Sequence, residues 1–191
     1  MDKTNRIRLF KSPDEWENWL DKNHLKSEGL WLRIYKKNSG KKSVTYSEAL
    51  DEALCYGWID GQKEKYDDKS WLQRFTPRRT GSIWSKKNTA HVERLLKDGK
   101  MKYAGLKEVN EAKADGRWDN AYHPQSSAGI PDDFMMELEK NNKAKIFFET
   151  LNKTNLYSIA YRLQTAKKIE TRRKRMELIL TMLSKGEKFH S

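Results

Sequence analysis

Cysteine, proline and long apolar runs are scarce in this sequence of 191 residues. Its only cysteine is Cys55, which excludes an internal disulfide and any zinc site that needs several cysteines. The four histidines are dispersed, and none stands at metal-ligand spacing from another. No stretch approaches the roughly 20 apolar residues of a membrane-spanning helix, and the N-terminal stretch MDKTNRIRLFKSPDEW has no signal-peptide core. We therefore expect a cytoplasmic protein with no transmembrane segment and no bound metal.

Familiar catalytic signatures are also missing. The sequence contains no glycine-rich nucleotide loop, no metalloprotease helix motif and no Gly-x-Ser-x-Gly nucleophile elbow. Hydrolases and metalloenzymes of the common classes are thus disfavoured, and we expect no cofactor.

Basic residues are abundant. Lys and Arg number 39 against 27 Asp and Glu, so the net charge is +12, and both halves of the chain are basic. Hydrophobic residues make up 36% and aromatic residues 11%, which is enough apolar material for a folded core. A folded, basic protein of this kind attracts polyanions, so nucleic acid is one partner to consider.

Helix and strand signals alternate over the first 120 residues. Ser12 and Thr45 each stand three residues before a glutamate, and both pairs have the pattern of a helix capping box. Between these two helices, alternation of apolar and amphipathic residues over 29–37 predicts a strand. Residues 58–66 and 70–76 predict two more strands, joined by a turn at DDK as a hairpin.

Two further helices are predicted near 85–99 and 102–115, before a change of composition. The stretch RWDNAYHPQSSAGIP has the proline, glycine and serine content of a linker, and every later signal is helical. We predict an α+β fold: an N-terminal domain over 1–120 with a small, mostly antiparallel sheet and helices, a linker over 121–130, and a small all-helical C-terminal domain over 131–191. The composition leaves open whether the two domains pack as one globule.

Three blocks of the sequence, EALCYGWIDG, RFTPRRTGSIWSKKN and AKKIETRRKRM, resemble the YdeI/OmpD-associated family, whose members are labelled bacteriocin-protection proteins. The resemblance implies that residues 130–188 hold the small helical domain of that family. It also implies a role in bacterial tolerance of envelope stress and antimicrobial peptides. No reaction and no cofactor come with the family.

A ligand site is predicted around the hairpin and the loop after it. Arg78 and Arg79 stand in this loop near Trp84, and arginine suits bidentate binding of phosphate or carboxylate. The start of the next helix, at Ser85 and Asn88, could add free amide groups, although helix capping alone also explains these two residues. The predicted ligand-binding residues are Trp58, Asp60, Arg74, Arg78, Arg79, Trp84, Ser85 and Asn88.

The tryptophans of this region and Asp60 have two interpretations. We expect Trp58 in the core, joined there by either Trp71 or Trp84, while the remaining one frames a surface hollow with the arginines. Asp60 fits equally an acceptor of hydrogen bonds in a turn and a catalytic acid or base at a pocket rim. It is the one candidate for a catalytic residue.

A run of basic residues marks the last predicted helix and consists of Arg172, Arg173, Lys174 and Arg175. Four consecutive residues spread around more than half of a helix, so they do not form one stripe. We favour a solvated face in which Arg172 or Arg175 pairs with Glu170 or with an acid of the N-terminal part. The alternative is contact with a polyanion such as RNA, DNA or an anionic lipid surface.

These observations favour a cytoplasmic bacterial stress or bacteriocin-protection protein that binds an anionic ligand or a partner and does not catalyse a reaction. The first alternative is a nucleic-acid-binding protein that uses its net charge and exposed aromatic residues. The second is an enzyme in which Asp60 is the acid or base and the arginines orient a carboxylate or phosphate substrate. The ligand and the oligomeric state do not follow from the sequence.

Overall fold

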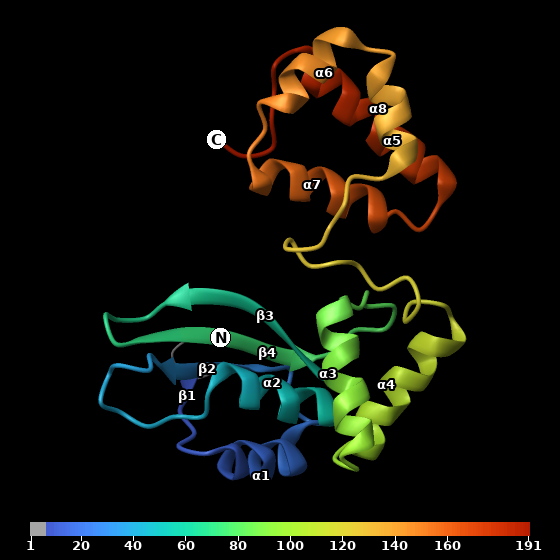
Figure 1. The fold of residues 1–191 in the computed structure, drawn as a ribbon. Helices are drawn as coiled ribbons and strands as arrows, with labels where there is room; N and C mark the ends of the chain where they lie inside the picture. The colour runs from blue at the N-terminus through green and yellow to red at the C-terminus, as the bar shows by residue number, and fades with distance from the viewer. Residues whose placement is uncertain (1–6) are drawn as a thin grey trace. The chain divides into compact units, whose positions relative to one another are not determined.

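The computed structural model describes residues 7–191, which form two compact units (Figure 1). The first, here called the sheet unit, contains residues up to Ser82 and then Asn88–Asp119. The second, called the helical unit, contains Ile83–Lys87 and Asn120–Ser191. The chain therefore passes from the sheet unit into the helical unit at 83–87, returns to the sheet unit at 88–119 and ends in the helical unit.

The first eight elements of the chain are β1 (Ile7–Arg8), α1 (Pro13–Asn23), β2 (Leu30–Tyr35), α2 (Tyr46–Cys55), β3 (Trp58–Lys65), β4 (Ser70–Pro77), α3 (Lys86–Lys97) and α4 (Tyr103–Ala114). The strands lie in the order β1-β2-β4-β3, in which β4 pairs antiparallel with β2 and β3 and β1 pairs parallel with β2. The predicted small and mostly antiparallel sheet is confirmed. The two-residue strand β1 was not predicted.

Local signals set the helix boundaries. Ser12 Oγ accepts a hydrogen bond from the backbone N–H of Glu15, so α1 begins at the predicted cap. At the start of α2, Thr45 and Glu48 form both hydrogen bonds of a capping box. Gly57 has a φ of +73° just after α2, a conformation that favours glycine, and it turns the chain into β3.

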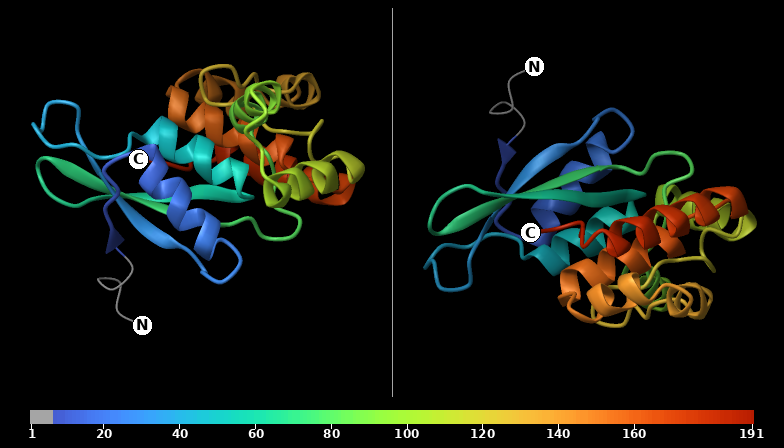
Figure 2. Two further views of the ribbon diagram at one scale, coloured as in Figure 1. Left: turned by 90° about the horizontal axis from the view of Figure 1, so that it is seen from below. Right: turned by 90° about the horizontal axis from the view of Figure 1, so that it is seen from above.

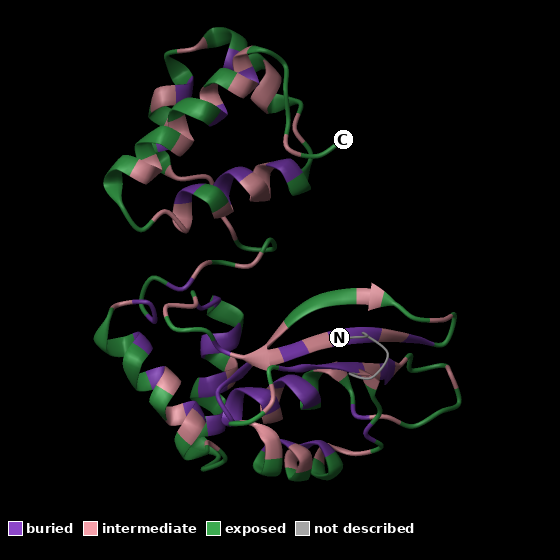
Figure 3. Cartoon of the chain, turned by 180° about the vertical axis from the view of Figure 1, so that it is seen from behind, coloured by how far each residue is buried: buried purple, intermediate pink, exposed green. Residues whose placement is uncertain are grey.

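The core of the sheet unit lies between one face of the sheet and helices α1 and α2, which cover that face (Figure 2). Trp16 of α1 is fully buried, and its ring centroid lies 5.7 Å from that of Phe75 and 6.2 Å from that of Trp58. Its indole N–H donates to the backbone oxygen of Ala49 in α2 at 3.0 Å. Every residue of the inner strand β4 is buried or partly buried, whereas half of the residues of the edge strand β3 are exposed (Figure 3).

The helical unit contains α5 (Asp132–Glu139), α6 (Asn142–Glu149), α7 (Lys153–Gln164) and α8 (Ile169–Ser184). Its core residues are Phe134, Leu138, Ala144, Ile159, Leu163, Ile179 and Leu183. The segment that comes from 83–87 joins this unit through a bridge between Ser85 and Tyr122. An all-helical C-terminal part is thus confirmed.

Over residues 7–191, the helices are all too short or too polar to span a bilayer. The same residues contain no group of three or more His, Cys, Asp or Glu side chains arranged to hold a metal ion.

Candidate functional site

The loop after β4 directs one of the two predicted arginines into the protein and the other into solvent. Arg78 directly follows β4, and its backbone N–H donates to the oxygen of Gly57 at 3.0 Å, which fixes it at the corner between α2 and β3. Only 7% of Arg78 is exposed. Arg79 is exposed, and its backbone N–H donates to Ser82 Oγ at 3.1 Å. The expected display of both arginines on a surface loop thus applies to Arg79 alone.

A second arginine, which the sequence did not single out, is buried in the same unit. Arg117 follows α4 and is 8% exposed. Its Nε donates to both carboxylate oxygens of Asp115, at 2.8 and 2.6 Å, and its Nη1 donates to the backbone oxygen of Ser82 at 2.9 Å. These bonds hold the guanidinium group in one orientation.

Glu108 of α4 lies within the electrostatic reach of both buried arginines. Burial, followed by the charge of Glu111, raises the pKa of the Glu108 carboxyl, although Arg78 and Arg117 act in the opposite direction. Its Oε2 is shielded from solvent and has no hydrogen-bond partner among the described residues. We call Arg78, Arg117 and Glu108 the arginine cluster.

Gly57 keeps the arginine cluster compact. A Cβ at this position would meet the backbone oxygen of Ala104 at 3.0 Å and Glu108 Cγ at 3.2 Å, so the stem of Glu108 packs directly on the glycine backbone. Asp115 balances the charge of Arg117, and Glu108, when ionised, balances that of Arg78, so the cluster gains an excess of positive charge as Glu108 takes up a proton, which its raised pKa favours. Guanidinium groups in such an arrangement can donate hydrogen bonds to the oxygens of a carboxylate or a phosphate.

The other predicted residues on the strands do not join this cluster in one pocket. Trp58 is a core residue, 1% exposed, and its indole N–H donates to the backbone oxygen of His24 at 3.1 Å. Asp60 is half-buried and accepts a hydrogen bond from Tyr46 Oη at 2.7 Å. Because Asp60 pairs with Phe75, it projects from the helix-covered face, whereas Arg74 projects from the opposite face.

Arg74 lies against the open face of the sheet. Its guanidinium carbon is 5.8 Å from the ring centroid of Trp31, and its Nη2 donates to the backbone oxygen of Glu28 at 3.4 Å. The tight turn at Gly29 makes room for this side chain, because a Cβ there would come within 3.1 Å of Arg74 Nη2. Arg74 therefore covers an aromatic ring and a turn of its own unit.

The remaining predicted residues, Trp84, Ser85 and Asn88, are all buried. Trp84 and Ser85 belong to the segment held in the helical unit, where the oxygen of Trp84 accepts a hydrogen bond from the backbone N–H of Tyr122 at 2.9 Å. Asn88 belongs to the sheet unit and lies in the first turn of α3, which begins directly after Ser85. Trp84, at 1% exposure, is therefore a packed residue and not the wall of a surface hollow.

Within the basic run of α8, two arginines hold neighbouring helices of the helical unit. Arg172 donates three hydrogen bonds to Asp133, of which the shortest is 2.7 Å, and its Nη1 donates to the oxygen of Leu163 at 2.6 Å. Arg175 Nη1 donates to the oxygen of Arg162, also at 2.6 Å. Both thus bind carbonyl groups at the end of α7, where a cation is favourable. The expected pairing of Arg172 or Arg175 with Glu170 or an N-terminal acid was wrong, because Arg172 pairs with Asp133 of α5 and Arg175 binds the end of α7.

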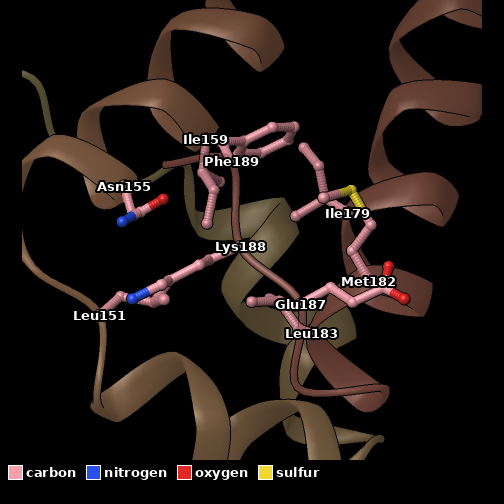
Figure 4. A pocket seen from close by; sticks show the side chains of 9 residues that line it. All are labelled: Leu151, Asn155, Ile159, Ile179, Met182, Leu183, Glu187, Lys188 and Phe189. Atoms are coloured by element: carbon pink, nitrogen blue, oxygen red, sulfur yellow. The ribbon is translucent and has the colours of Figure 1, made fainter. Parts of the chain in front are cut away.

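The other two basic residues of this run, Arg173 and Lys174, are exposed. Arg173 pairs with Glu177 one turn later at 3.1 Å. The small cavity that Figure 4 shows in the core of the helical unit, between α7, α8 and the C-terminal tail, has a volume of about 10 Å³. Ile159, Ile179 and Phe189 are among its lining residues, and its volume leaves room for about one water molecule and not for a small-molecule ligand.

Comparison with known families covers both units. A family model described as a domain of unknown function (DUF8412) matches residues 8–108, which is more than half of the chain. A second model, described as bacteriocin-protection, YdeI or OmpD-associated, matches residues 127–186 and confirms the resemblance that the sequence showed. Searches among curated proteins and among solved structures gave no match.

Proposed function

This chain belongs to the family of the domain of unknown function DUF8412 and contains a YdeI/OmpD-associated segment, and we propose that it takes part in bacteriocin protection by binding an anionic ligand or partner at the arginine cluster. The observation that carries this proposal is the burial of two arginines, Arg78 and Arg117, within electrostatic reach of the Glu108 carboxyl, whose pKa is raised. Partial removal from water strengthens the attraction between such cations and an anion. Since burial raises the pKa of Glu108, this carboxyl competes less with an incoming anion than a solvated glutamate would.

Arg78 supports the proposal more strongly than its neighbour. Both arginines stand in the same loop, but of the two only Arg78 is buried and acts on the charge of Glu108. Arg79 is exposed and therefore serves as a matched control. We also propose a cytoplasmic location, which cell fractionation tests separately.

The first test is a thermal-shift screen of the full chain with phosphate, sulfate, citrate and short dicarboxylates. A ligand at 100 times its Kd stabilises the folded state by about 2.7 kcal/mol, or about 5–10 °C for a chain of this size. Arg78→Lys, which keeps the charge but loses the bidentate geometry, should reduce the shift, and Arg79→Lys should leave it unchanged. The proposal fails if no anion shifts the melting temperature, or if both variants lose the shift equally.

The pH dependence of binding tests the role of Glu108. The raised pKa means that this carboxyl gains its proton at a higher pH than a free glutamate, and the loss of negative charge should strengthen anion binding as the pH falls. Glu108→Gln should bind at least as tightly as the protonated wild type and should lose this part of the pH dependence. Isothermal titration between about pH 4 and pH 8 measures both. Identical pH profiles for the two proteins would remove Glu108 from the site.

The link to bacteriocin protection needs a test in cells. A bacterial strain without this chain should become more sensitive to a bacteriocin, and the wild-type gene or the Arg79→Lys variant should restore survival. The Arg78→Lys variant should restore less. Full rescue by Arg78→Lys, despite lost anion binding in solution, would separate protection from the arginine cluster.

A further inference from the structure

A pocket of about 500 Å³ opens at the far end of the hairpin from the arginine cluster. It is lined by Lys36, Lys63, Glu64, Lys65, Ser70 and Trp71. Trp71 and Arg78 are seven residues apart along and just past β4, which is about 23 Å in an extended chain. The pocket is therefore a separate feature, and a ligand bound there would be independent of the proposed function.

The pocket exists because the hairpin runs past the helices that cover the sheet (Figure 1). Trp71 pairs with Ile34 and with Lys65, and so it projects from the same face as the core residue Phe75. Phe75 is fully buried, whereas Trp71, four residues nearer the turn, remains partly exposed. An aromatic ring thus forms the floor of an open hollow.

The indole N–H of Trp71 is a hydrogen-bond donor without an acceptor among the described residues. The nitrogen is also shielded from solvent. The ammonium group of Lys63 lies 5.0 Å from the centroid of the ring. A ligand oxygen that accepts from Nε1 would therefore also lie near a cation.

Positive charge accumulates around this floor. The segment 36–42 carries four lysines and no acid, and it lies beside the hairpin turn because the backbone N–H of Lys36 donates to the oxygen of Lys69 at 2.9 Å. Of the two acids of the turn, Asp67 pairs with Arg33 at 2.6 Å. Asp68 pairs with Lys65 at 3.2 Å, but both side chains are exposed, so this pair is weak and a phosphate can replace Asp68 at Lys65. Within the part of the chain that the structure describes, Glu64 is the only acid that lines the pocket.

We propose that this pocket binds single-stranded nucleic acid, with a base against the indole of Trp71 and phosphates at Lys36, Lys63 and Lys65. An aromatic platform flanked by cations is the arrangement that binds single strands with little sequence preference. A membrane surface fits less well, because among the described residues the only exposed large hydrophobic side chain of this hairpin is Tyr66. The ring of Tyr66 lies under Arg33, whose guanidinium carbon is 4.5 Å from the ring centroid.

The experiment measures the affinity of the full chain for a fluorescently labelled 15-nucleotide oligothymidine by anisotropy. Three phosphate contacts predict a loss of affinity of about 20-fold between 50 and 200 mM salt. Exchanging both Lys36 and Lys63 for Glu should weaken binding and reduce this salt dependence to about threefold. The control variant, with Lys97→Glu and Lys143→Glu, has the same net charge at two exposed helical sites and should bind like the wild type.

Two variants of Trp71 separate the ring from its N–H group. Trp71→Phe keeps a stacking surface and loses the donor, which should cost about 2- to 10-fold in affinity. Trp71→Ala should cost more, about 5- to 150-fold. If either variant fails to fold, as judged by circular dichroism, the lysine variant still decides the question.

Three results would overturn the proposal. The first is no binding of the oligonucleotide at 50 mM salt. The second is an equal loss in the lysine variant and its control, which would mean attraction by net charge alone. The third is salt-dependent binding to phosphatidylglycerol vesicles that requires Lys36 and Lys63 while the oligonucleotide does not bind.

Discussion

Gly105 permits the close contact between α2 and α4, and replacing it with alanine should destabilise the sheet unit although alanine is the better helix former. An ideal Cβ at Gly105 would lie 2.3 Å from the backbone oxygen of Cys55 and 2.6 Å from that of Leu54. These are backbone atoms at the end of α2, which cannot rotate away. The same Cys55 oxygen accepts a hydrogen bond from the N–H of Lys102 at 3.2 Å, so a shift of α4 would also disturb that bond.

The size of the effect depends on two opposing contributions. Alanine is favoured over glycine inside a helix by about 1 kcal/mol. Forcing an extra methyl group into a packed contact costs about 1–3 kcal/mol and occasionally more. With several backbone atoms closer than 3.0 Å to the new methyl group, we expect the upper end of this range and a net loss of about 2 kcal/mol. That corresponds to a fall of about 8 °C in melting temperature for a unit of this size.

Urea and thermal unfolding, followed by circular dichroism, measure the free energy of unfolding of the Gly105→Ala variant. The matched control is Gly129→Ala, since a Cβ at Gly129 meets nothing within 4 Å. The control should change stability by less than about 1 kcal/mol. A Gly105→Ala variant as stable as the wild type would refute the close approach of α4 to α2.

Three further predictions concern single side chains. Hydrogen bonds from Arg172 lower the pKa of Asp133, so the pair stabilises the helical unit above the unfolded pKa near 4 and loses this effect as the pH falls through the lower folded pKa. The Asp133→Asn variant should therefore unfold more easily than the wild type at pH 7 but not below about pH 2, and thermal unfolding across this pH range measures the difference. Tyr46→Phe removes the hydrogen bond to Asp60 and should cost about 1 kcal/mol in urea unfolding, and an unchanged midpoint would show that this bond contributes nothing. Burial raises the pKa of Cys55 to about 12, so Ellman's reagent at about pH 8 should modify this thiol only after unfolding; rapid modification of the folded protein would contradict its burial.

The sequence predicted those elements whose signals are local. The caps at Ser12 and Thr45 and the turn between β3 and β4 each depend on residues within a few positions of one another, and the structure has each of them. Strand β1 escaped prediction because two residues carry no periodicity. Its conformation comes from pairing of Ile7 with Trp31, a partner distant in the sequence.

The arginine cluster was only partly predictable. Arg78 was identified, but Arg117 and Glu108 resemble solvated charges when only their neighbours in the sequence are considered. One signal was present: Glu108 stands three residues after Gly105 and one before Val109, on the face of α4 that carries the small and apolar residues. Whether this cluster and the other predicted residues bind a ligand stays a prediction.

The tryptophans show where strand alternation stops being informative. Alternation places Trp71 and Phe75 on the same face of β4, and the register confirms it. Yet only Phe75 lies under the helices, because the hairpin extends beyond them. Trp84 instead became the second buried tryptophan of this region, after Trp58. How far a strand projects past its covering helices depends on helix length and position, which alternation does not encode.

The segment 83–87 has a consequence for the order in which the protein matures on the ribosome. It is made before the last helices of the sheet unit, but its hydrogen-bond partner Tyr122 and the rest of the helical unit come later. At about 5–20 residues per second, the roughly 100 residues after Lys87 take about 5–20 s to synthesise. During that time Trp84, which the finished protein buries, has no completed unit to enter. A nascent chain stalled between the two units should therefore bind chaperones at this segment. A gene fragment that starts at residue 120 should encode a helical unit that lacks the segment 83–87.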